Sequence, residues 1–170
     1  MPKGIGPNTH TWPVTVEIER KFVTREPPDA ELLGAGVAIR QGYLAEEGKV
    51  AVRVRIADDS AVLTVKGGGG LSRTEVEVSI SNDDADALWP LTAGRRIEKT
   101  RHRVVLDGGG GLVAEVDIYA GELMGLCTVE VEFDSEAAAT AFSPPAWFGR
   151  DVTGQAEWSN AALARHGRPA

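Results

Sequence analysis

Hydrophobic and polar residues alternate along most of the chain between residues 14 and 133, the pattern of half-buried β-strands. In TVEIERKFV, residues 15–23, Glu17, Glu19 and Lys21 share one parity, while valine, isoleucine and phenylalanine fill much of the other. Successive side chains of a strand point to opposite faces, so the charged and apolar residues separate. Similar patterns, mostly rich in valine, predict about eight strands, over 14–24, 37–45, 49–57, 61–67, 73–80, 96–106, 112–119 and 126–133.

Helical patterns are short and fall between or after these strands. The glycine runs at 67–70 and 108–111 indicate hairpins between antiparallel strands, because neither run opens a helix or carries the Gly-Lys-Ser/Thr ending of a phosphate-binding loop. Residues 1–13 carry no period, which predicts a flexible N-terminal extension before a single domain over 14–170. The expected helices are 29–36, 82–89, 135–142 and 159–167, with Asp29, Asn82, Ser135 and Ser159 as N-caps.

Charged residues recur on one parity of strand after strand and balance one another, although the whole chain has a formal charge of -7. Acidic residues come in i, i+2 pairs, whose side chains lie about 7 Å apart on one face and repel unless a cation lies between them. The basic members are Lys21, Arg53, Arg55, Lys66, Arg73, Lys99, Arg101 and Arg103, and the acidic members are Glu17, Glu19, Glu75, Glu77, Glu115, Asp117, Glu130 and Glu132.

Two arrangements give such a charged face. An exposed sheet can carry cross-strand ion pairs, each contributing about 0.2–1 kcal/mol. Alternatively, the sheet closes into a barrel, gathers its charges in one hydrated lumen and leaves helices to cover the apolar outside. Divalent metals satisfy carboxylates and phosphate oxygens satisfy arginine and lysine, so the barrel predicts a metal-bound polyphosphate as ligand.

Composition narrows the class of protein further. The 170 residues suit one globular domain, with 42% hydrophobic and 25% charged residues. The negative net charge argues against non-specific binding to nucleic acid or anionic membranes. No apolar run is long enough to cross a membrane and no secretory signal is recognised, so we expect a cytoplasmic protein. Cys127 is expected to be a small buried hydrophobic residue, and the three isolated histidines show no zinc spacing.

The segment VEIERKF resembles the ExExK signature of the CYTH superfamily, the triphosphate tunnel metalloenzymes. The segments VRVRI, LTVKG, RTEVEVSI, EKTRHRV, AEVDIY and VEVEF resemble the remaining strand motifs of that family in the same order, so the resemblance spans about residues 14–167. The tail WFGRDVTGQAEWSNAALARHG is similar to short bacterial members, whose C-terminal helix lies near one tunnel mouth. One departure is that the signature begins at Glu17 instead of almost at the initiator methionine.

The resemblance implies a mainly β fold: a closed eight-stranded antiparallel barrel that binds triphosphate with Mg²⁺ or Mn²⁺, two ions being expected. For the reaction itself, we expect Lys66 or Lys99 to assist as an acid or a base. Glu17, Glu19, Glu130 and Glu132 are then expected to hold the metals, and Glu75, Glu77, Glu115 and Asp117 to complete a second metal position or orient water. The phosphates are assigned to Lys21, Arg53, Arg55, Lys66, Arg73, Lys99, Arg101 and Arg103.

Hydrolysis of inorganic triphosphate to pyrophosphate and phosphate is the leading hypothesis, because the sequence offers few aromatic residues for binding a base or thiazole ring. Class IV-type adenylate cyclase and thiamine or nucleoside triphosphatase are the alternative activities. A polyphosphate- or nucleotide-binding module is the non-enzymatic alternative. The expected partner is a small-molecule triphosphate, with no membrane or nucleic acid, and the protein is expected to be a monomer or a homodimer.

Overall fold

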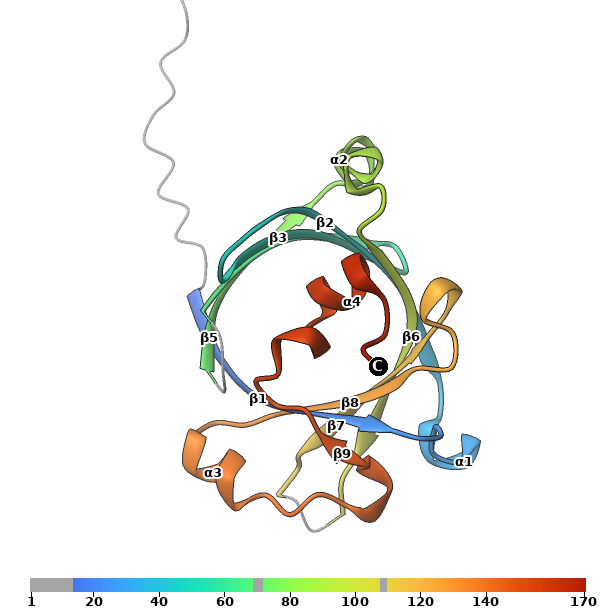
Figure 1. The fold of residues 1–170 in the computed structure, drawn as a ribbon, viewed down its shortest axis with the longest axis vertical. Helices are drawn as coiled ribbons and strands as arrows, with labels where there is room; N and C mark the ends of the chain where they lie inside the picture. Colours follow the sequence, from blue (N-terminus) through green and yellow to red (C-terminus); the bar gives the residue numbers. More distant parts are fainter. Residues whose placement is uncertain (1–13, 69–71, 108–109) are drawn as a thin grey trace, which may run out of the picture.

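The structure is a computed structural model and describes residues 14–68, 72–107 and 110–170. Its antiparallel sheet has the strand order β5-β4-β3-β2-β6-β7-β8-β1, and the pairing of β5 with β1 closes the ring seen in Figure 1. The predicted closed eight-stranded barrel is confirmed. The strands are β1 (Val14–Thr24), β2 (Gly36–Glu47), β3 (Val50–Ala57), β4 (Ser60–Gly68), β5 (Ser72–Ile80), β6 (Arg96–Val105), β7 (Val113–Tyr119) and β8 (Cys127–Glu132).

A ninth strand, β9 (Arg150–Asp151), was not predicted. It pairs with the end of β1, where Phe22 and Val23 lie opposite Asp151 and Arg150, while β5 pairs with the beginning of β1. The C-terminal tail is thereby attached to the barrel wall. Two residues are too few to show an alternating pattern, so the strand arises from a non-local pairing that local periodicity does not reveal.

Within the described residues, four helices and four 3₁₀ turns connect or follow the strands. Ser135 and Ser159 cap their helices as predicted, but the predicted N-cap Asn82 is wrong, because Ser81 accepts the capping bond from the Asp84 amide. Asp29 occupies the N-cap position of a four-residue helix without a side-chain bond. The helices are α1 (Ala30–Leu33), α2 (Asn82–Leu88), α3 (Glu136–Ala141) and α4 (Asn160–His166), and the turns are η1 (Trp89–Thr92), η2 (Gly121–Leu123), η3 (Ala146–Phe148) and η4 (Ala156–Trp158).

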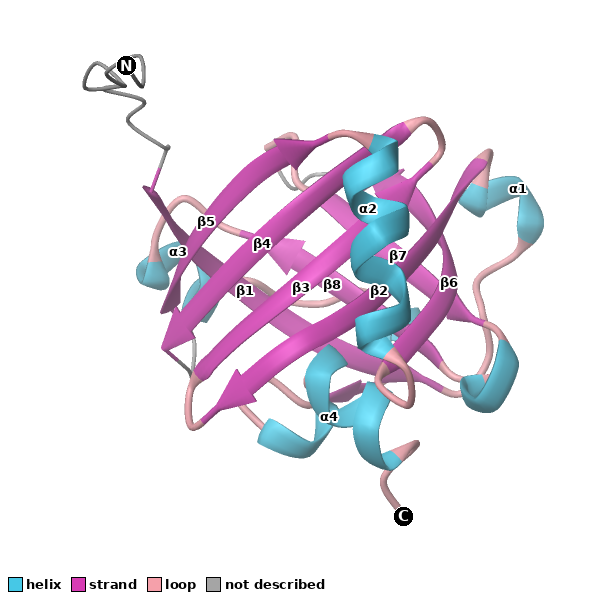
Figure 2. Ribbon diagram, turned by 90° about the horizontal axis from the view of Figure 1, so that it is seen from above, coloured by secondary structure: helices cyan, strands magenta, loops and turns pink. Residues whose placement is uncertain are grey.

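Apolar residues on the outer faces of the strands pack beneath the helices, which leaves the opposite faces to line the interior. Phe22, Val116 and Phe148 belong to a buried cluster outside β1, β7 and β8, over which α3 and η3 lie. Ala85 of α2 packs with Val54 in a second cluster outside β3. Figure 2 shows α2 running along the outer surface of the barrel. Burial of these apolar residues favours closure of the sheet.

The C-terminal helix α4 lies across one end of the barrel, as expected from the resemblance. It falls within the outline of the ring in Figure 1 and at one end of the strands in Figure 2. Leu163 of α4 is buried in a cluster with Tyr43, Tyr119 and Trp158. This cluster closes that end of the barrel.

Both glycine runs join neighbouring antiparallel strands, because β4 pairs with β5 and β6 pairs with β7. The turn residues 69–71 and 108–109 lie outside the described residues, as does the predicted extension 1–13. Cys127 is buried as expected, and burial raises the pKa of its thiol to about 12. No helix in the described ranges has both the length and the apolar character required to cross a membrane.

Candidate active site

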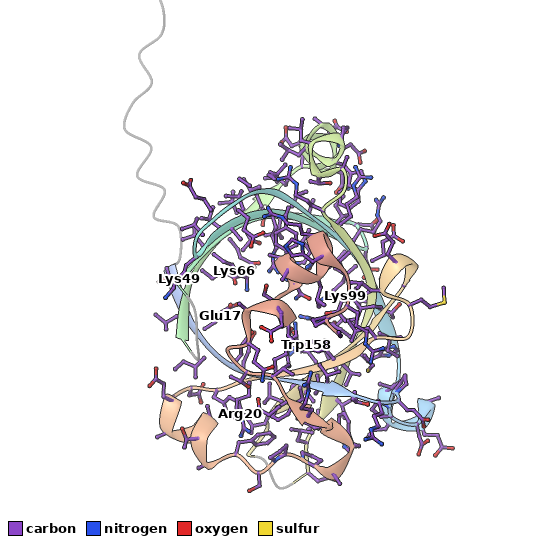
Figure 3. The ribbon with its side chains drawn as sticks, viewed as in Figure 1. Glu17, Arg20, Lys49, Lys66, Lys99 and Trp158 are labelled. Carbon is purple, nitrogen blue, oxygen red and sulfur yellow. The ribbon has the colours of Figure 1, made fainter. Side chains whose placement is uncertain are left out.

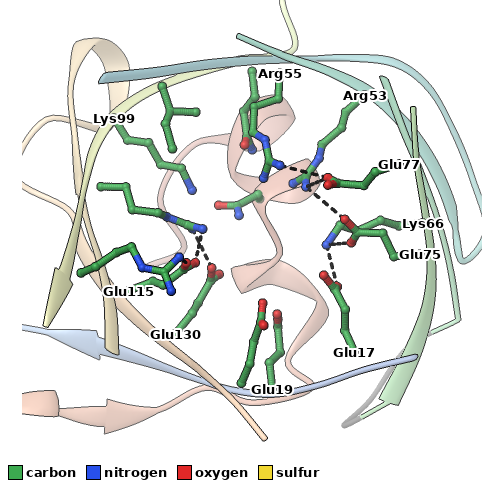
Figure 4. Close-up of a pocket in the computed structure, with 16 residues that line it drawn as sticks. Glu17, Glu19, Arg53, Arg55, Lys66, Glu75, Glu77, Lys99, Glu115 and Glu130 are labelled. Atoms are coloured by element: carbon green, nitrogen blue, oxygen red, sulfur yellow. Dashed lines mark hydrogen bonds and ion pairs between the residues drawn. The ribbon is translucent and has the colours of Figure 1, made fainter. Parts of the chain in front are cut away.

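The interior of the barrel holds a cavity of about 240 Å³ that gathers charged side chains from seven strands. Figure 3 shows Glu17, Lys66 and Lys99 directed into the ring, whereas Arg20 lies outside it. Arg20 instead donates to the Phe142 carbonyl at 2.8 Å and pairs with Asp151 at 2.5 Å. The predicted charged residues that line the cavity are Glu17, Glu19, Arg53, Arg55, Lys66, Glu75, Glu77, Lys99, Arg101, Arg103, Glu115, Glu130 and Glu132 (Figure 4).

Three predicted site residues are not among those that line the cavity. Asp117 is fully buried behind it, between Lys99 and Arg101. Lys21 lies behind Glu130, with 3.0 Å between the Lys21 Nζ and the Glu130 carboxylate. The side chain of Arg73 lies outside the described part of the structure. Lys21 and Asp117 therefore support the cavity wall, and they meet its ligand only if the neighbouring side chains move.

Arg101 is the centre of the ion pairs on the β6–β8 side. Its guanidinium contacts Asp117 at 2.6 Å and Glu130 at 3.0 Å, and it also pairs with Glu115. Burial raises the pKa of Glu130, but Lys21 and then Arg101 outweigh this effect and hold the pKa well below its usual value. Burial likewise raises the pKa of Asp117, but Lys99 and then Arg101 outweigh this effect and lower the pKa, so Glu130 and Asp117 are anionic in the free protein and are neutralised by the protein's own cations.

Lys99 stands beside this group with Nζ 2.5 Å from Asp117, and its side chain is only 2% exposed. Burial lowers the pKa of its ammonium group to about 8, against the opposing attraction of Asp117. A lysine with a pKa near 8 is suited to proton transfer near neutral pH, which supports Lys99 as the acid or base.

A second set of ion pairs lies on the β3–β5 side of the cavity. Arg55 contacts Glu77 at 3.0 Å, and Arg53 lies 3.8 Å from both Glu75 and Glu77. Lys66 bridges Glu75 and Glu17, the latter at 2.8 Å. Burial, followed by the proximity of Glu17, raises the pKa of Glu75 to about 7.

Two pairs of carboxylates lie directly opposite each other across neighbouring strands. Glu19 faces Glu132 between β1 and β8, and Glu115 faces Glu130 between β7 and β8. Like charges in such positions repel and destabilise a sheet. Burial, followed by Glu115 and then Glu17, raises the pKa of Glu132. Arg101 already pairs with both Glu115 and Glu130, so the part of this wall suited to a bound cation is the one that carries Glu19 and Glu132.

Three uncharged lining residues were missed by sequence analysis, namely Ile39, Gln41 and Asn160. Ile39 and Gln41 share the inward parity of β2, and the Gln41 amide donates to the Tyr43 hydroxyl at 3.1 Å. Alternation along β2 is consistent with an inward position for both residues, but neither carries a charge, so neither belongs to the charged pattern of the strands. Asn160 comes from α4, so no strand pattern indicates it.

A second hollow of about 250 Å³ adjoins the cavity and shares Ile39, Arg55, Arg101, Arg103 and Glu115 with it. Its other lining residues include Val37, Ala57 and Val62. Val37 lies at the beginning of β2, whereas Tyr43, which packs in the cluster beneath α4, lies further along the same strand. The second hollow is therefore the mouth at the end of the barrel away from α4.

The fold and the site define an antiparallel barrel protein with a charge-lined interior cavity. The chain is 46% identical over 149 residues to the inorganic triphosphatase of Nitrosomonas europaea, covering 87% of this chain and 96% of that protein. It is 37% identical over 153 residues to the inorganic triphosphatase of Acetivibrio thermocellus, covering 88% and 94%. The chain belongs to the family of these inorganic triphosphatases.

Solved structures agree with this assignment. A crystal structure of an inorganic triphosphatase matches with a TM-score of 0.66 and 42% identity, over 91% of this chain and 97% of the other. A Hippeastrum protein described as an adenylyl cyclase with dominant triphosphatase activity matches with a TM-score of 0.57 over 73% and 82% of the two chains. At 16% identity, that second match shows only a common fold. No protein-family model matches the chain.

Proposed function

We propose that the protein hydrolyses inorganic triphosphate to pyrophosphate and phosphate, as a triphosphate tunnel metalloenzyme of the CYTH superfamily. The observation that carries the proposal is the single cavity in which arginine, lysine and carboxylate side chains face one another. Triphosphate carries several negative charges, and the cost of burying it falls when preorganised cations surround it. The names of the relatives at 46% and 37% identity support the same substrate.

The cationic residues fit a phosphate ligand. Arg53 is only 7% exposed, and its Nε is buried without a hydrogen-bond partner among the described residues. An unsatisfied buried donor is costly, and an arginine fork matches the oxygens of a phosphoryl group. Arg55 and Lys66 line the same cavity. We assign these residues to binding the phosphate chain, with Lys99, Arg101 and Arg103 around them.

The carboxylates fit a hard divalent cation such as Mg²⁺ or Mn²⁺, which prefers oxygen ligands. In the described ranges, no three histidine, cysteine, aspartate or glutamate side chains are already grouped as a metal site. Lys66 and Arg101 instead pair with Glu17 and Glu130. A cation near Glu19 and Glu132 relieves the repulsion between these opposed carboxylates, and Glu17 and Glu130 complete the proposed ligand set. When bound, the metal supplies positive charge to the phosphate oxygens and lowers the pKa of water.

The remaining chemistry is positioning and proton transfer. Arginine side chains hold the phosphate chain so that water attacks in line with the leaving pyrophosphate, and the enclosed cavity strengthens their electrostatic effect. Lys99 in its neutral form accepts the proton of the attacking water, because burial places its pKa near 8. Asp117, bonded to both Lys99 and Arg101, holds these two side chains in position.

This role of Lys99 predicts the pH dependence of the reaction. Only the neutral amine accepts a proton, so kcat/KM should rise with pH and level off above about 8. Initial rates with Mg²⁺-triphosphate between pH 6 and 10 measure this profile. Lys99→Arg should lose most of the activity, and its remaining kcat/KM should no longer rise with pH. Lys66→Arg should keep the rise of kcat/KM with pH. A kcat/KM that falls as the pH rises through 8 would show that Lys99 acts only as a protonated phosphate ligand.

The mouth of the cavity favours the inorganic substrate over a nucleotide or thiamine triphosphate. Its lining within the described residues contains aliphatic Val37, Ala57 and Val62 but no aromatic side chain. Recognition of a base generally uses a stacking platform. The mouth therefore lacks the group that would orient an adenosine for cyclisation, in which the ribose 3′ hydroxyl attacks the α-phosphate.

A substrate panel tests the proposed function. Triphosphate, thiamine triphosphate, ATP and 5′-triphosphorylated RNA are incubated with Mg²⁺ or Mn²⁺, and the products are separated by ion-exchange chromatography. We expect triphosphate to have the highest kcat/KM and to yield pyrophosphate and phosphate in equal amounts. Conversion of ATP to cyclic AMP without cleavage of triphosphate would contradict the proposal. Tight metal-dependent binding without any product would instead favour a polyphosphate-binding module.

A further inference from the structure

Asn160 is an uncharged residue at the end of the cavity that α4 closes. It is the first residue of α4 and lines the cavity with the charged strand residues. The buried Tyr119 hydroxyl donates to the Asn160 Oδ1 at 2.7 Å and lies 3.3 Å from the Thr128 Oγ1. Because Tyr119 donates its one hydroxyl proton to Asn160, Thr128 must be the donor in the bond between the Thr128 and Tyr119 hydroxyl groups. The chain of bonds thus fixes the Asn160 amide.

With Oδ1 occupied by Tyr119, the remaining polar group of the Asn160 side chain is its NH₂, which can only donate. This nitrogen has no acceptor within the part of the chain that the structure describes. The Tyr119 ring also lies beneath Lys99, whose Nζ is 5.6 Å from the ring centroid. Tyr119 therefore contacts both the neutral donor Asn160 and the charged donor Lys99, which lie at the same end of the cavity.

We propose that Asn160 is a specificity-determining residue that donates from Nδ2 to the phosphoryl group at the closed end of the cavity. This inference rests on the proposed function, because it concerns the same substrate. A terminal phosphoryl group presents more free oxygens than a group within the chain, so one neutral donor beside Lys99 adds a directional contact there. Tyr119 is a positioning residue, because it acts through the orientation of Asn160.

Two substitutions of Asn160 separate contact with the substrate from anchoring of the helix. Asn160→Asp keeps an oxygen that accepts from Tyr119, so the link between α4 and the barrel survives. It replaces the donor by an anionic acceptor, which repels phosphate. Asn160→Ala loses both the link and the donor but adds no charge. Contact with the substrate and mere anchoring therefore predict opposite orders of activity for these two variants.

We expect kcat/KM for Mg²⁺-triphosphate to fall about tenfold in Asn160→Ala and about a hundredfold in Asn160→Asp, since a hydrogen bond to a charged group is lost in both and repulsion is added in the second. The thermal midpoint should fall in Asn160→Ala and stay near the parent value in Asn160→Asp. Tyr119→Phe should raise KM more than it lowers kcat, because it loosens the amide without removing it. Asn82→Asp, the same change at the first residue of the external helix α2, should leave the kinetics unchanged.

Asn160→Asp with parental kinetics, or with more activity than Asn160→Ala, would overturn the inference and leave Asn160 as an anchor of α4. Failure of the proposed function has a different signature, because the parent protein itself would then not cleave triphosphate in the same assay. In that case the variants are compared by calorimetric titration with triphosphate and Mg²⁺. Equal affinity of parent and Asn160→Asp for triphosphate would then contradict the assigned contact.

Discussion

Glu19→Gln should abolish metal-dependent hydrolysis of triphosphate while leaving the fold intact. Glu19 lines the cavity and faces Glu132 across the β1–β8 pair, in the wall that we assign to the cation. The substitution keeps the shape of the side chain but removes one negative charge. Loss of the metal's charge stabilisation, worth several kcal/mol, corresponds to a fall in kcat of about a thousandfold or more.

Although Glu19→Gln should lose its activity, its free energy of unfolding should stay the same or rise. Opposed carboxylates repel, so removal of one charge beside Glu132 relieves repulsion in the metal-free protein. Urea unfolding without metal should therefore give a midpoint equal to or above that of the parent. Glu98→Gln is the matched control, because Glu98 is exposed on the outer parity of β6. Unchanged turnover in Glu19→Gln would remove Glu19 from the proposed metal site.

Arg55→Ala should weaken substrate binding and lower turnover together. Arg55 lines both the cavity and its mouth, and its charge is positioned to act on the phosphate chain in the ground state and in the transition state. Removal of one preorganised donor of this kind costs about a hundredfold to a thousandfold. We therefore expect a raised KM and a lowered kcat, with kcat/KM reduced by at least about a hundredfold.

The control for Arg55→Ala is Arg40→Ala, on the neighbouring strand β2. The Arg40 guanidinium lies 5.2 Å from the centre of the Trp89 ring, among residues outside the barrel. Its removal takes away the same charge without touching the cavity, so the kinetics should stay at the parent values. A fall in thermal stability of Arg55→Ala with unchanged kinetics would show that the Arg55–Glu77 pair is structural.

The barrel and the inward direction of its charges could be predicted because both follow from a local rule. Alternation along each strand decides which side chains share a face, and β1 begins and ends where its pattern indicates, at residues 14 and 24. Of the fifteen predicted charged residues whose side chains the structure describes, thirteen line the cavity for that reason. Closure itself was inferred from the cost of exposing an apolar face and of leaving sheet edges unpaired.

The depth of each side chain within the barrel could not be predicted in this way. Asp117 and Lys21 have the inward parity, but strand tilt and register place them beneath Lys99, Arg101 and Glu130. Parity distinguishes inside from outside and gives no position along the barrel axis. The ion pairs that bury these two residues join different strands, β1 with β8 for Lys21 and β6 with β7 for Asp117, so the pattern of one strand does not contain them.

The elements that were missed or misplaced depend on contacts outside their own segments. Strand β9 exists because two residues pair with the end of β1. Helix α1 covers only Ala30–Leu33, where the sequence predicted a longer segment over 29–36. Asn160 enters the cavity through the packing of α4 against the barrel end. Each case is decided by tertiary packing, which overrides weak local preference.

The most direct measurement is diffraction from crystals grown with Mn²⁺ and a non-hydrolysable triphosphate analogue, with Mn²⁺ located by its anomalous scattering. We expect the analogue inside the barrel, with its oxygens on Arg53 and Arg55, and an Mn²⁺ peak against Glu19 and Glu132. An analogue and metal bound outside the barrel, with the ion pairs of the cavity undisturbed, would contradict the proposed site.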